Sequence, residues 1–210
     1  MAYSAKASTD PQSPVRTGVN LASFAELAVR LVNSTVCDAE ADPLRTCQAF
    51  RDFIADRPFL AAPVTQHDLD RLKLLRADLA TVFTNAVAGN ENAAVDRLNN
   101  LLMIHPVQPM LVSHDGEPWH LHMADAGSII DRYAAVSVIS LSLLFGQLGA
   151  ERFGICAIAS CDRVFIDGSS NKSRRYCADH SAARTNVASL PSKRPGLAEE
   201  TTGTVASAAS

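Results

Sequence analysis

The sequence predicts a mainly α-helical protein with one small β-hairpin, in which a helical domain is followed by a small C-terminal module. Three observations support this fold class. Hydrophobic residues make up 47% of the 210 residues, close to the globular average, so a core can form. Apolar residues recur at helical spacing through most of 20–145. Beyond Gly146 and Gly149, which we expect to break the chain, the sequence becomes rich in cysteine and basic residues.

The two ends of the chain are polar and rich in small residues. Residues 1–18 and 191–210 are therefore predicted to be disordered, which leaves 19–148 for the helical domain and 149–190 for the module. The N-terminus has no apolar run typical of a secretory signal. The longest apolar stretch, 133–144, contains three serines and is too short to span a bilayer. We expect a cytoplasmic protein with reduced cysteines.

Two helices are predicted in the first third of the chain. Asn20 can cap the first, which runs to about Val32 with apolar residues at helical spacing. Its apolar face comprises Leu21, Phe24, Leu27, Ala28 and Leu31. The second is expected to start after Asp42-Pro43, because a capping residue followed by proline is typical of a helix start. Its apolar stripe comprises Leu44, Cys47, Phe50 and Ile54.

A third and a fourth helix follow. Thr65 and Asp68 resemble a capping box at the start of the third, and Gly89 is expected to end it. Its apolar face comprises Leu69, Leu72, Leu75, Leu79, Val82, Phe83 and Ala86. The fourth is expected from about Glu91 to Ile104, where His105-Pro106 stops it. Its inward residues are Ala94, Leu98, Leu101 and Leu102.

Residues 109–123 change in character. Their pattern predicts a β-hairpin around Asp115-Gly116. A long helix is then expected from Asp125, as its cap, to about Phe145. With this helix the predicted helical domain is complete.

Four side chains of metal-binding type stand in two close pairs in the module. Four residues separate Cys156 from Cys161, two separate Cys177 from His180, and fifteen lie between the pairs. Structural zinc sites take four soft or borderline ligands in a tetrahedron, supplied by closely spaced pairs. The spacing therefore predicts that these four residues bind Zn²⁺, although idle cysteines and a surface histidine are the alternative.

The segment between the two pairs suits such a site. Val164-Phe165-Ile166 is typical of a short strand, and residues 167–171 have the composition of a turn, so the chain can fold back. The module is too small to bury a core of its own. A bound metal would supply the missing folding free energy, on the order of 10 kcal/mol in small zinc modules.

The same stretch carries a longer pattern of fixed spacings. Its members are Cys156, Cys161, Phe165, Asp167, Ser169, Asn171, Arg174, Arg175 and Cys177. This pattern resembles the CGNR zinc-finger family of bacterial transcription regulators. A weaker likeness extends upstream to landmarks of that family's helical N-terminal domain, namely Leu31-Val32-Asn33, Leu75-Arg76, Leu98-Asn99 and the Asp115-Gly116 hairpin. The resemblance implies a zinc-binding regulator that contacts DNA.

The chain departs from the motif that gives this family its name. Where the family has Cys-Gly-Asn-Arg, the sequence has Ser181-Ala182-Ala183-Arg184. The family's fourth zinc ligand is thus replaced by Ser181, whose neutral hydroxyl is a poor zinc ligand. We expect the preceding His180 to complete the site. A site with three ligands and a water, or a module without metal, is the alternative.

Charge divides the chain into an acidic body and a basic C-terminal segment. Residues 1–150 hold 11 Lys/Arg and 16 Asp/Glu, whereas 151–194 hold 8 and 4. A basic segment indicates an anionic partner, and arginine pairs well with phosphate and guanine. The residues predicted to contact DNA are Lys172, Arg174, Arg175, Arg184 and Asn186. Each basic residue alone is more often a solvated surface group, and Arg174 or Arg175 can instead pair with Asp167.

These observations favour a zinc-dependent DNA-binding transcription regulator. The alternative is a non-DNA sensing or protein-interaction protein whose degenerate module is only structural. A zinc enzyme with an open position at Ser181 is disfavoured, because no general base is placed nearby, and no hydrolase, nucleotide or metalloprotease motif is present. A homodimer and a small-molecule effector at the helical domain are expected only by analogy with regulators.

Several histidine, tryptophan and cysteine residues outside the module are weaker candidates for a functional role. His120 and His122 would lie on one face of a strand, but such histidines are more often surface groups than ligands. Trp119 is expected to be a core or interface anchor. Cys37 and Cys47 have no evident role.

Overall fold

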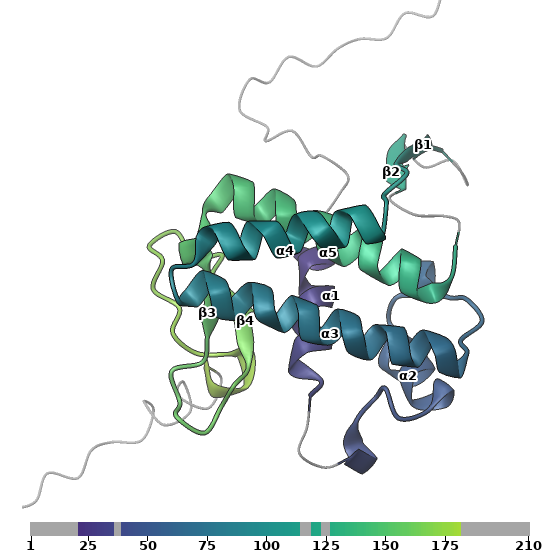
Figure 1. The fold of residues 1–210 in the computed structure, drawn as a ribbon, viewed down its shortest axis with the longest axis horizontal. Coiled ribbons are helices and arrows are strands. Elements are labelled where there is room, and N and C mark those ends of the chain that lie inside the picture. The colour runs from purple at the N-terminus through teal and green to yellow at the C-terminus, as the bar shows by residue number, and fades with distance from the viewer. Residues whose placement is uncertain (1–20, 36–38, 114–118, 123–126, 182–210) are drawn as a thin grey trace, which may run out of the picture.

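The computed structural model describes residues 21–35, 39–113, 119–122 and 127–181 (Figure 1). These residues form a helical body, a hairpin that projects from it, and a small β-containing module near the C-terminus (Figure 1). The predicted fold class is confirmed, with a second two-stranded sheet in the module in addition to the hairpin. Asn20 and the predicted disordered ends lie outside the described residues.

Four long helices build the body. They are α1 (Leu21–Asn33), α3 (Gln66–Val87), α4 (Glu91–Ile104) and α5 (Ile129–Leu148). Helix α1 makes its most extensive contacts with α5, and α3 runs beside α4 (Figure 1). The largest fully buried side chains include Tyr133, Phe50 and Phe83. The Tyr133 hydroxyl donates to the Leu27 carbonyl at 2.8 Å, which ties α5 to α1 inside the core.

The predicted limits of α3 are confirmed. The Thr65 hydroxyl accepts from the Asp68 amide at 3.2 Å, and the Asp68 carboxylate accepts from the Thr65 amide at 2.9 Å. These reciprocal bonds satisfy two amides at the helix start. Gly89 follows the helix end with φ +76°, a conformation that glycine adopts without steric cost.

The short helix α2 (Cys47–Phe53) starts later than predicted. Its cap is Thr46, which accepts from the Ala49 amide at 3.1 Å. Asp42 is occupied otherwise, because its carboxylate accepts from the Leu44 amide at 2.8 Å and from Arg76 Nη1 at 2.9 Å. The ion pair with Arg76 on α3 therefore holds the segment after Asp42 as a turn. Two 3₁₀ helices, η1 (Ala39–Ala41) and η2 (Pro58–Leu60), flank α2.

Helix α5 also differs from the prediction at both ends. Its cap is Ser128 in a capping box with Asp131, and the predicted cap, Asp125, lies outside the described residues. Gly146 does not break the helix, which continues to Leu148 and ends before Gly149 with φ +85°. Leu144 and Leu148 on either side of Gly146 pack on the core. This packing outweighs a glycine penalty of about 1 kcal/mol.

Helix α5 is long and apolar enough to cross a membrane by length and composition alone. However, 61% of its apolar window is buried inside the protein. It is also the helix that α1 covers most extensively. These properties are those of a central core helix.

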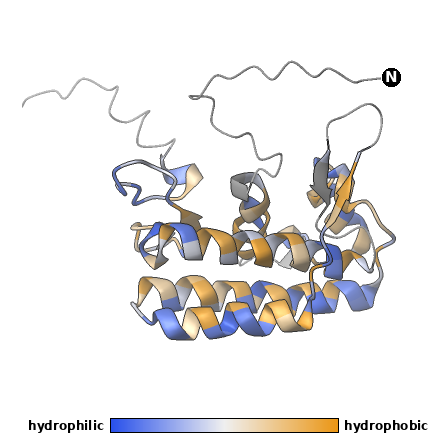
Figure 2. Cartoon of the chain, turned by 90° about the horizontal axis from the view of Figure 1, so that it is seen from above, coloured by the Kyte–Doolittle hydropathy of each residue, from blue (hydrophilic) through white to orange (hydrophobic). Residues whose placement is uncertain are grey.

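The hairpin that the sequence predicts is present. Strand β1 (Met110–Val112) pairs antiparallel with β2 (His120–His122), with Leu111 opposite Leu121. The predicted turn at Asp115-Gly116 lies outside the described residues. Figure 1 shows the two strands projecting beyond the end of α4, and Figure 2 shows the apolar strand β1 in orange.

The module begins after α5. The 3₁₀ helix η3 (Ala150–Arg152) leads into β3 (Phe153–Ile155), which pairs antiparallel with the predicted strand, β4 (Val164–Ile166). Strand β3 was not predicted. Gly154 lies opposite Phe165, and a Cβ at Gly154 would collide with the Phe165 ring. The glycine therefore lets the ring lie across β3.

Candidate metal centre

The structure brings together the four predicted metal ligands. Cys156 follows β3, Cys161 lies in the turn before β4, and Cys177 and His180 lie at the start of a helical turn over 178–181. Their ligand atoms all lie within 4.8 Å of one another. Cys156 and Cys177 are buried, and Cys161 and His180 are half-buried.

Backbone hydrogen bonds fix the first pair of ligands. The Cys156 amide donates to the Arg163 carbonyl at 2.8 Å, which extends the β3–β4 pairing by one residue. The Cys161 amide donates to the Ile158 carbonyl at 2.9 Å and closes the turn between the two cysteines.

The second pair is fixed by a helical turn. The Ser181 amide donates to the Cys177 carbonyl at 2.9 Å. Residues three apart in such a turn share one side, so Cys177 and His180 both face the first pair. The Ala157 amide donates to the Arg175 carbonyl at 2.9 Å and joins the two halves of the site.

The distances between donor atoms bracket those of a tetrahedral zinc site. His180 Nδ1 lies 3.2 Å from Cys156 Sγ and 3.5 Å from Cys177 Sγ, and Cys161 Sγ lies 4.0 Å from Cys177 Sγ. Zinc–sulfur bonds of about 2.3 Å and zinc–nitrogen bonds of about 2.0–2.1 Å place tetrahedral neighbours roughly 3.6–3.8 Å apart. Three thiols and one imidazole are also a ligand set that zinc accepts.

His180, rather than Ser181, stands in the cluster. Ser181 occupies the position of the fourth cysteine of the CGNR motif and is exposed, whereas the His180 ring contacts two of the three thiols. This placement supports the expected replacement of the missing thiolate by imidazole.

The pKa values of the Cys156 and Cys161 thiols are shifted in opposite directions by their surroundings. Burial raises the pKa of Cys156, but hydrogen bonds from the Ile158 and Cys177 amides and from His180 outweigh it and lower the pKa to about 6. Burial and the neighbouring thiols raise the pKa of Cys161 above its usual value. A cluster of thiols without a cation thus resists full deprotonation, whereas a divalent cation stabilises all of the thiolates.

Asp167 organises the loop between the two ligand pairs. Its buried carboxylate accepts from the Ser169 amide at 2.8 Å and the Arg174 amide at 2.9 Å. Burial opposes ionisation, but these bonds and the nearby Arg152 charge lower the pKa of Asp167. The alternative that Arg174 pairs with Asp167 is therefore realised through the backbone amide of Arg174.

Asn33 connects the module to the helical body. Its Nδ2 donates to the Val164 carbonyl at 2.9 Å, and its Oδ1 accepts from the Val164 amide at 2.8 Å. The amide side chain thereby pairs with β4 as a neighbouring strand would. The resemblance marked Asn33 as a landmark, but the contact spans 131 residues, and no local pattern could have revealed it.

The structure places the predicted DNA-contacting residues in different settings. Lys172 forms an ion pair with Glu151. The Arg174 guanidinium lies 5.0 Å from the centre of the Phe165 ring and donates to the Tyr176 carbonyl at 3.0 Å. Arg175 is exposed, and its side chain makes no hydrogen bond or ion pair within the described part of the chain. Arg184 and Asn186 lie outside the described residues.

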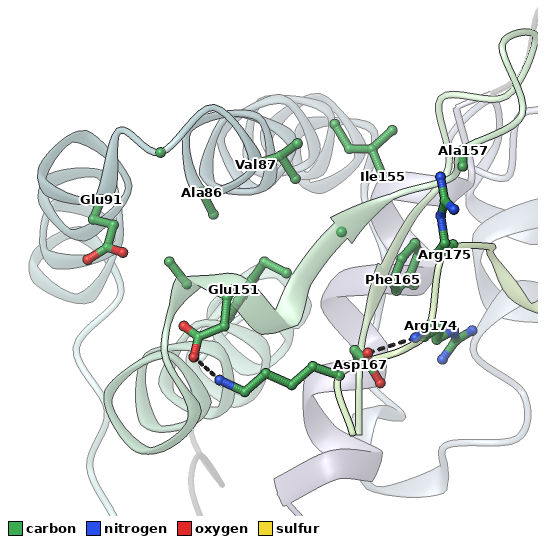
Figure 3. A pocket seen from close by; sticks show the side chains of 15 residues that line it. Ala86, Val87, Glu91, Glu151, Ile155, Ala157, Phe165, Asp167, Arg174 and Arg175 are labelled. Carbon is green, nitrogen blue, oxygen red and sulfur yellow. Dashed lines mark hydrogen bonds and ion pairs between the residues drawn. The ribbon is translucent and has the colours of Figure 1, made fainter. Parts of the chain in front are cut away.

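An open cavity of about 490 Å³ is lined by residues of the module and by residues at the end of α3 and the start of α4 (Figure 3). Val87 and Ile155 contribute apolar walls, and Glu91 lies across the cavity from Arg175 (Figure 3). Arg175 is therefore reachable from solvent at the junction of the two parts.

A helical body that carries a compact cysteine–histidine module defines a protein of the zinc-finger class. Residues 25–145 match the family model of ABATE, described as "Putative stress-induced transcription regulator". Residues 152–194 match the CGNR zinc finger. Because the ABATE match covers more than half of the chain, the protein belongs to the ABATE family, and the resemblance to CGNR proteins is confirmed. No curated protein matches this chain.

Both families are regulator-like rather than enzymatic. This agrees with the expectation that the module is not a catalytic site. The match to the CGNR finger extends to residue 194, so Arg184 and Asn186 fall within the family's module.

Proposed function

We propose that this protein is a cytoplasmic transcription regulator that binds DNA through its zinc-loaded C-terminal module. The observation that carries the proposal is the convergence of Cys156, Cys161, Cys177 and His180 on one point. The cluster is close in sequence to Arg175, which has no side-chain partner among the described residues. The family match supports a regulator, and the basic charge of 151–194 supports an anionic partner.

The proposed role of zinc is structural. Bound zinc would cross-link the turn that holds Cys156 and Cys161 to the helical turn that holds Cys177 and His180. This would fix the segment from Lys172 to Arg175 between the two ligand pairs. Residues on a rigid scaffold bind phosphate with a smaller loss of conformational entropy.

The proposed DNA contacts differ in strength. Arg175 is the strongest candidate in the described residues, because its guanidinium needs no partner exchange to meet a phosphate or a base. Lys172 must leave Glu151, and Arg174 must leave Phe165, before either can do so. Arg184 and Asn186 follow the helical turn at 178–181, and a helix continuing from it would present them to a groove.

Fluorescence anisotropy with fragments of the genomic region that surrounds the gene would test this function. Each phosphate contact contributes about 0.9 to the slope of log affinity against log salt. Arg175→Ala should weaken binding and lower that slope by about 1. Arg163→Ala is the matched control, since Arg163 is exposed in the same module but paired with Asp179. Zinc-loaded protein that binds no fragment at low salt would refute DNA binding.

A second function is favoured by one observation. A cavity of about 340 Å³ lies between α1, α5 and β4, with apolar walls that include Val29 and Leu144 and with Glu26 and Arg174 among its lining residues. Ligand sites are commonly concave and apolar with a few polar groups. In a sensing protein whose zinc module is only structural, an amphipathic effector would bind here. This function predicts zinc binding, no DNA binding, and ligand-induced stabilisation that Leu144→Arg abolishes.

A further inference from the structure

Large apolar side chains are exposed at the end of α4 and along the hairpin. They are Met103, Ile104, Met110, Leu111 and Trp119, which we name the hairpin surface, and each is between 58% and 80% exposed. Trp119 was expected to anchor a core or an interface, and at 71% exposure it does not belong to the core. Exposed apolar patches of this kind mark interaction sites in soluble proteins.

Both faces of strand β1 carry an exposed apolar side chain. Successive side chains of a strand point to opposite faces, yet Met110 and its neighbour Leu111 are both exposed. Among the described residues, β1 pairs only with β2, so its outer edge has no partner strand. An isolated two-stranded hairpin is marginally stable in water, and it gains stability when a further strand or surface covers it.

The five side chains of the hairpin surface are uncharged. For the four members on α4 and β1 this extends to their sequence neighbours, because residues 98–114 contain no Asp, Glu, Lys or Arg, whereas Asp115 and Glu117 precede Trp119. DNA and anionic membranes attract basic surfaces, which this one is not. An uncharged apolar surface is best complemented by another of the same composition, and homodimer interfaces are depleted in charge at their centre.

We propose that the hairpin surface is the interface at which two copies of this chain associate around a twofold axis. The proposal is independent of the metal site and of DNA binding. In such an interface the two β1 edges pair antiparallel, giving a four-stranded sheet in the order β2-β1-β1-β2. A twofold contact of this kind is self-complementary, because each copy offers the same edge.

The exposed apolar area is of the order that such an interface needs. If a large side chain has about 150–250 Å² of surface, the five residues together expose on the order of 600 Å² per copy. This is below the roughly 800 Å² per partner of a standard interface, so the β1–β1 backbone pairing must supply part of the contact. Trp119 is the expected hot spot, since tryptophan dominates binding energy at interface centres.

Light scattering coupled to size-exclusion chromatography tests this proposal on the full chain. The wild-type protein should elute with twice the chain mass of 22.4 kDa at micromolar concentration. Leu111→Lys should halve that mass, because lysine on a strand edge prevents pairing, and Trp119→Ala should raise the dissociation constant at least about 10-fold. Val87→Lys is the matched control and should remain a dimer. Val87 is likewise exposed, but it lies at the other end of the α3–α4 pair, about 20 Å away along the helices.

Each outcome supports or overturns the proposal. Circular dichroism and zinc content, measured on every variant, separate a lost interface from a lost fold or a lost metal. A monomeric wild-type protein, or a folded Leu111→Lys variant that remains dimeric, overturns it. A monomer that floats with neutral phosphatidylcholine vesicles would also overturn it, because the surface would then bind lipid. A dimer that dissociates only in the hairpin variants supports it, whether or not the protein binds DNA.

Discussion

In the helical body the largest fully buried side chains are aromatic and aliphatic, and they include Phe50, Phe83 and Tyr133. In the module the buried groups include Cys156, Cys177 and Asp167, which are small or polar. The body can fold through apolar burial alone. The module contributes Phe153 and Val164 to the shared core, and elsewhere it is held by hydrogen bonds and by the contacts among its candidate metal ligands. Disruption of the metal centre should therefore spare the body, whereas disruption of the core should reach both.

The largest effect is expected from removal of the metal. Cys177→Ser, or chelation of the wild-type protein, should abolish amide protection over 156–163 and 167–181 while α3 and α5 keep theirs. Structural zinc in small modules contributes on the order of 10 kcal/mol to folding at neutral pH. Hydrogen exchange read by mass spectrometry measures this.

Cys47→Ser is the matched control, because Cys47 is a half-buried thiol outside the cluster. If the module segments keep their protection after chelation, then the metal does not hold the module and the comparison between the two regions fails.

A core substitution should affect both regions. Phe83 is fully buried, and its ring centre lies 5.3 Å from that of Phe153 in β3. Phe83→Ala should lower the free energy of unfolding by about 3–5 kcal/mol, as measured by urea denaturation. Val95→Ala on the surface of α4 should change it by less than about 0.5 kcal/mol. Equal effects of the two variants would show that Phe83 is not part of a close-packed core.

Loss of the Asn33 side chain should loosen the module locally. Asn33→Ala leaves the Val164 amide and carbonyl without their partners, which costs about 1–3 kcal/mol for a buried polar group. The Val164 amide should exchange faster by a corresponding factor. Asn100→Ala serves as control, because Asn100 is exposed on α4. An unchanged exchange rate at Val164 in the Asn33 variant would contradict the docking role.

The smallest effect concerns pH and the body alone. Burial lowers the pKa of His105 below 6.5, although Asp131 opposes this. The unfolded chain then binds a proton more readily than the folded one, so stability falls as pH drops below 6.5 and levels off below the folded pKa. His105→Gln should flatten this dependence in thermal unfolding relative to the wild type measured in the same buffers, since the cysteine cluster is common to both proteins. If the pH dependence of stability in His105→Gln equals that of the wild type, a group other than His105 takes up the proton on unfolding.

Much of the body could be predicted from the sequence, because apolar periodicity and caps are local signals. The Thr65–Asp68 capping box and the stop at Gly89 were both predicted. The errors arose where distant contacts override local preference. Asp42 pairs with Arg76 instead of capping α2, and core packing carries α5 through Gly146.

In the module, spacing alone predicted the four candidate ligands. It could not show that Asn33 pairs with β4 or that Lys172 pairs with Glu151, because both contacts join residues far apart in the chain. The sequence also could not show that the Arg175 side chain is exposed, because the position of an arginine in a basic segment does not reveal whether it pairs with an acidic residue.

The central claim is tested most directly by the ratio of zinc to protein. It should be measured in the purified wild type, in His180→Ala, and in the double variant that combines His180→Ala with Ser181→Cys. If Cys156, Cys161, Cys177 and His180 bind the metal, the wild type holds one zinc per chain and His180→Ala loses it. The double variant should regain it, because Ser181→Cys restores the fourth thiolate of the family motif. A wild-type protein without zinc, or a His180→Ala variant that retains one zinc per chain at the same affinity, would contradict the site.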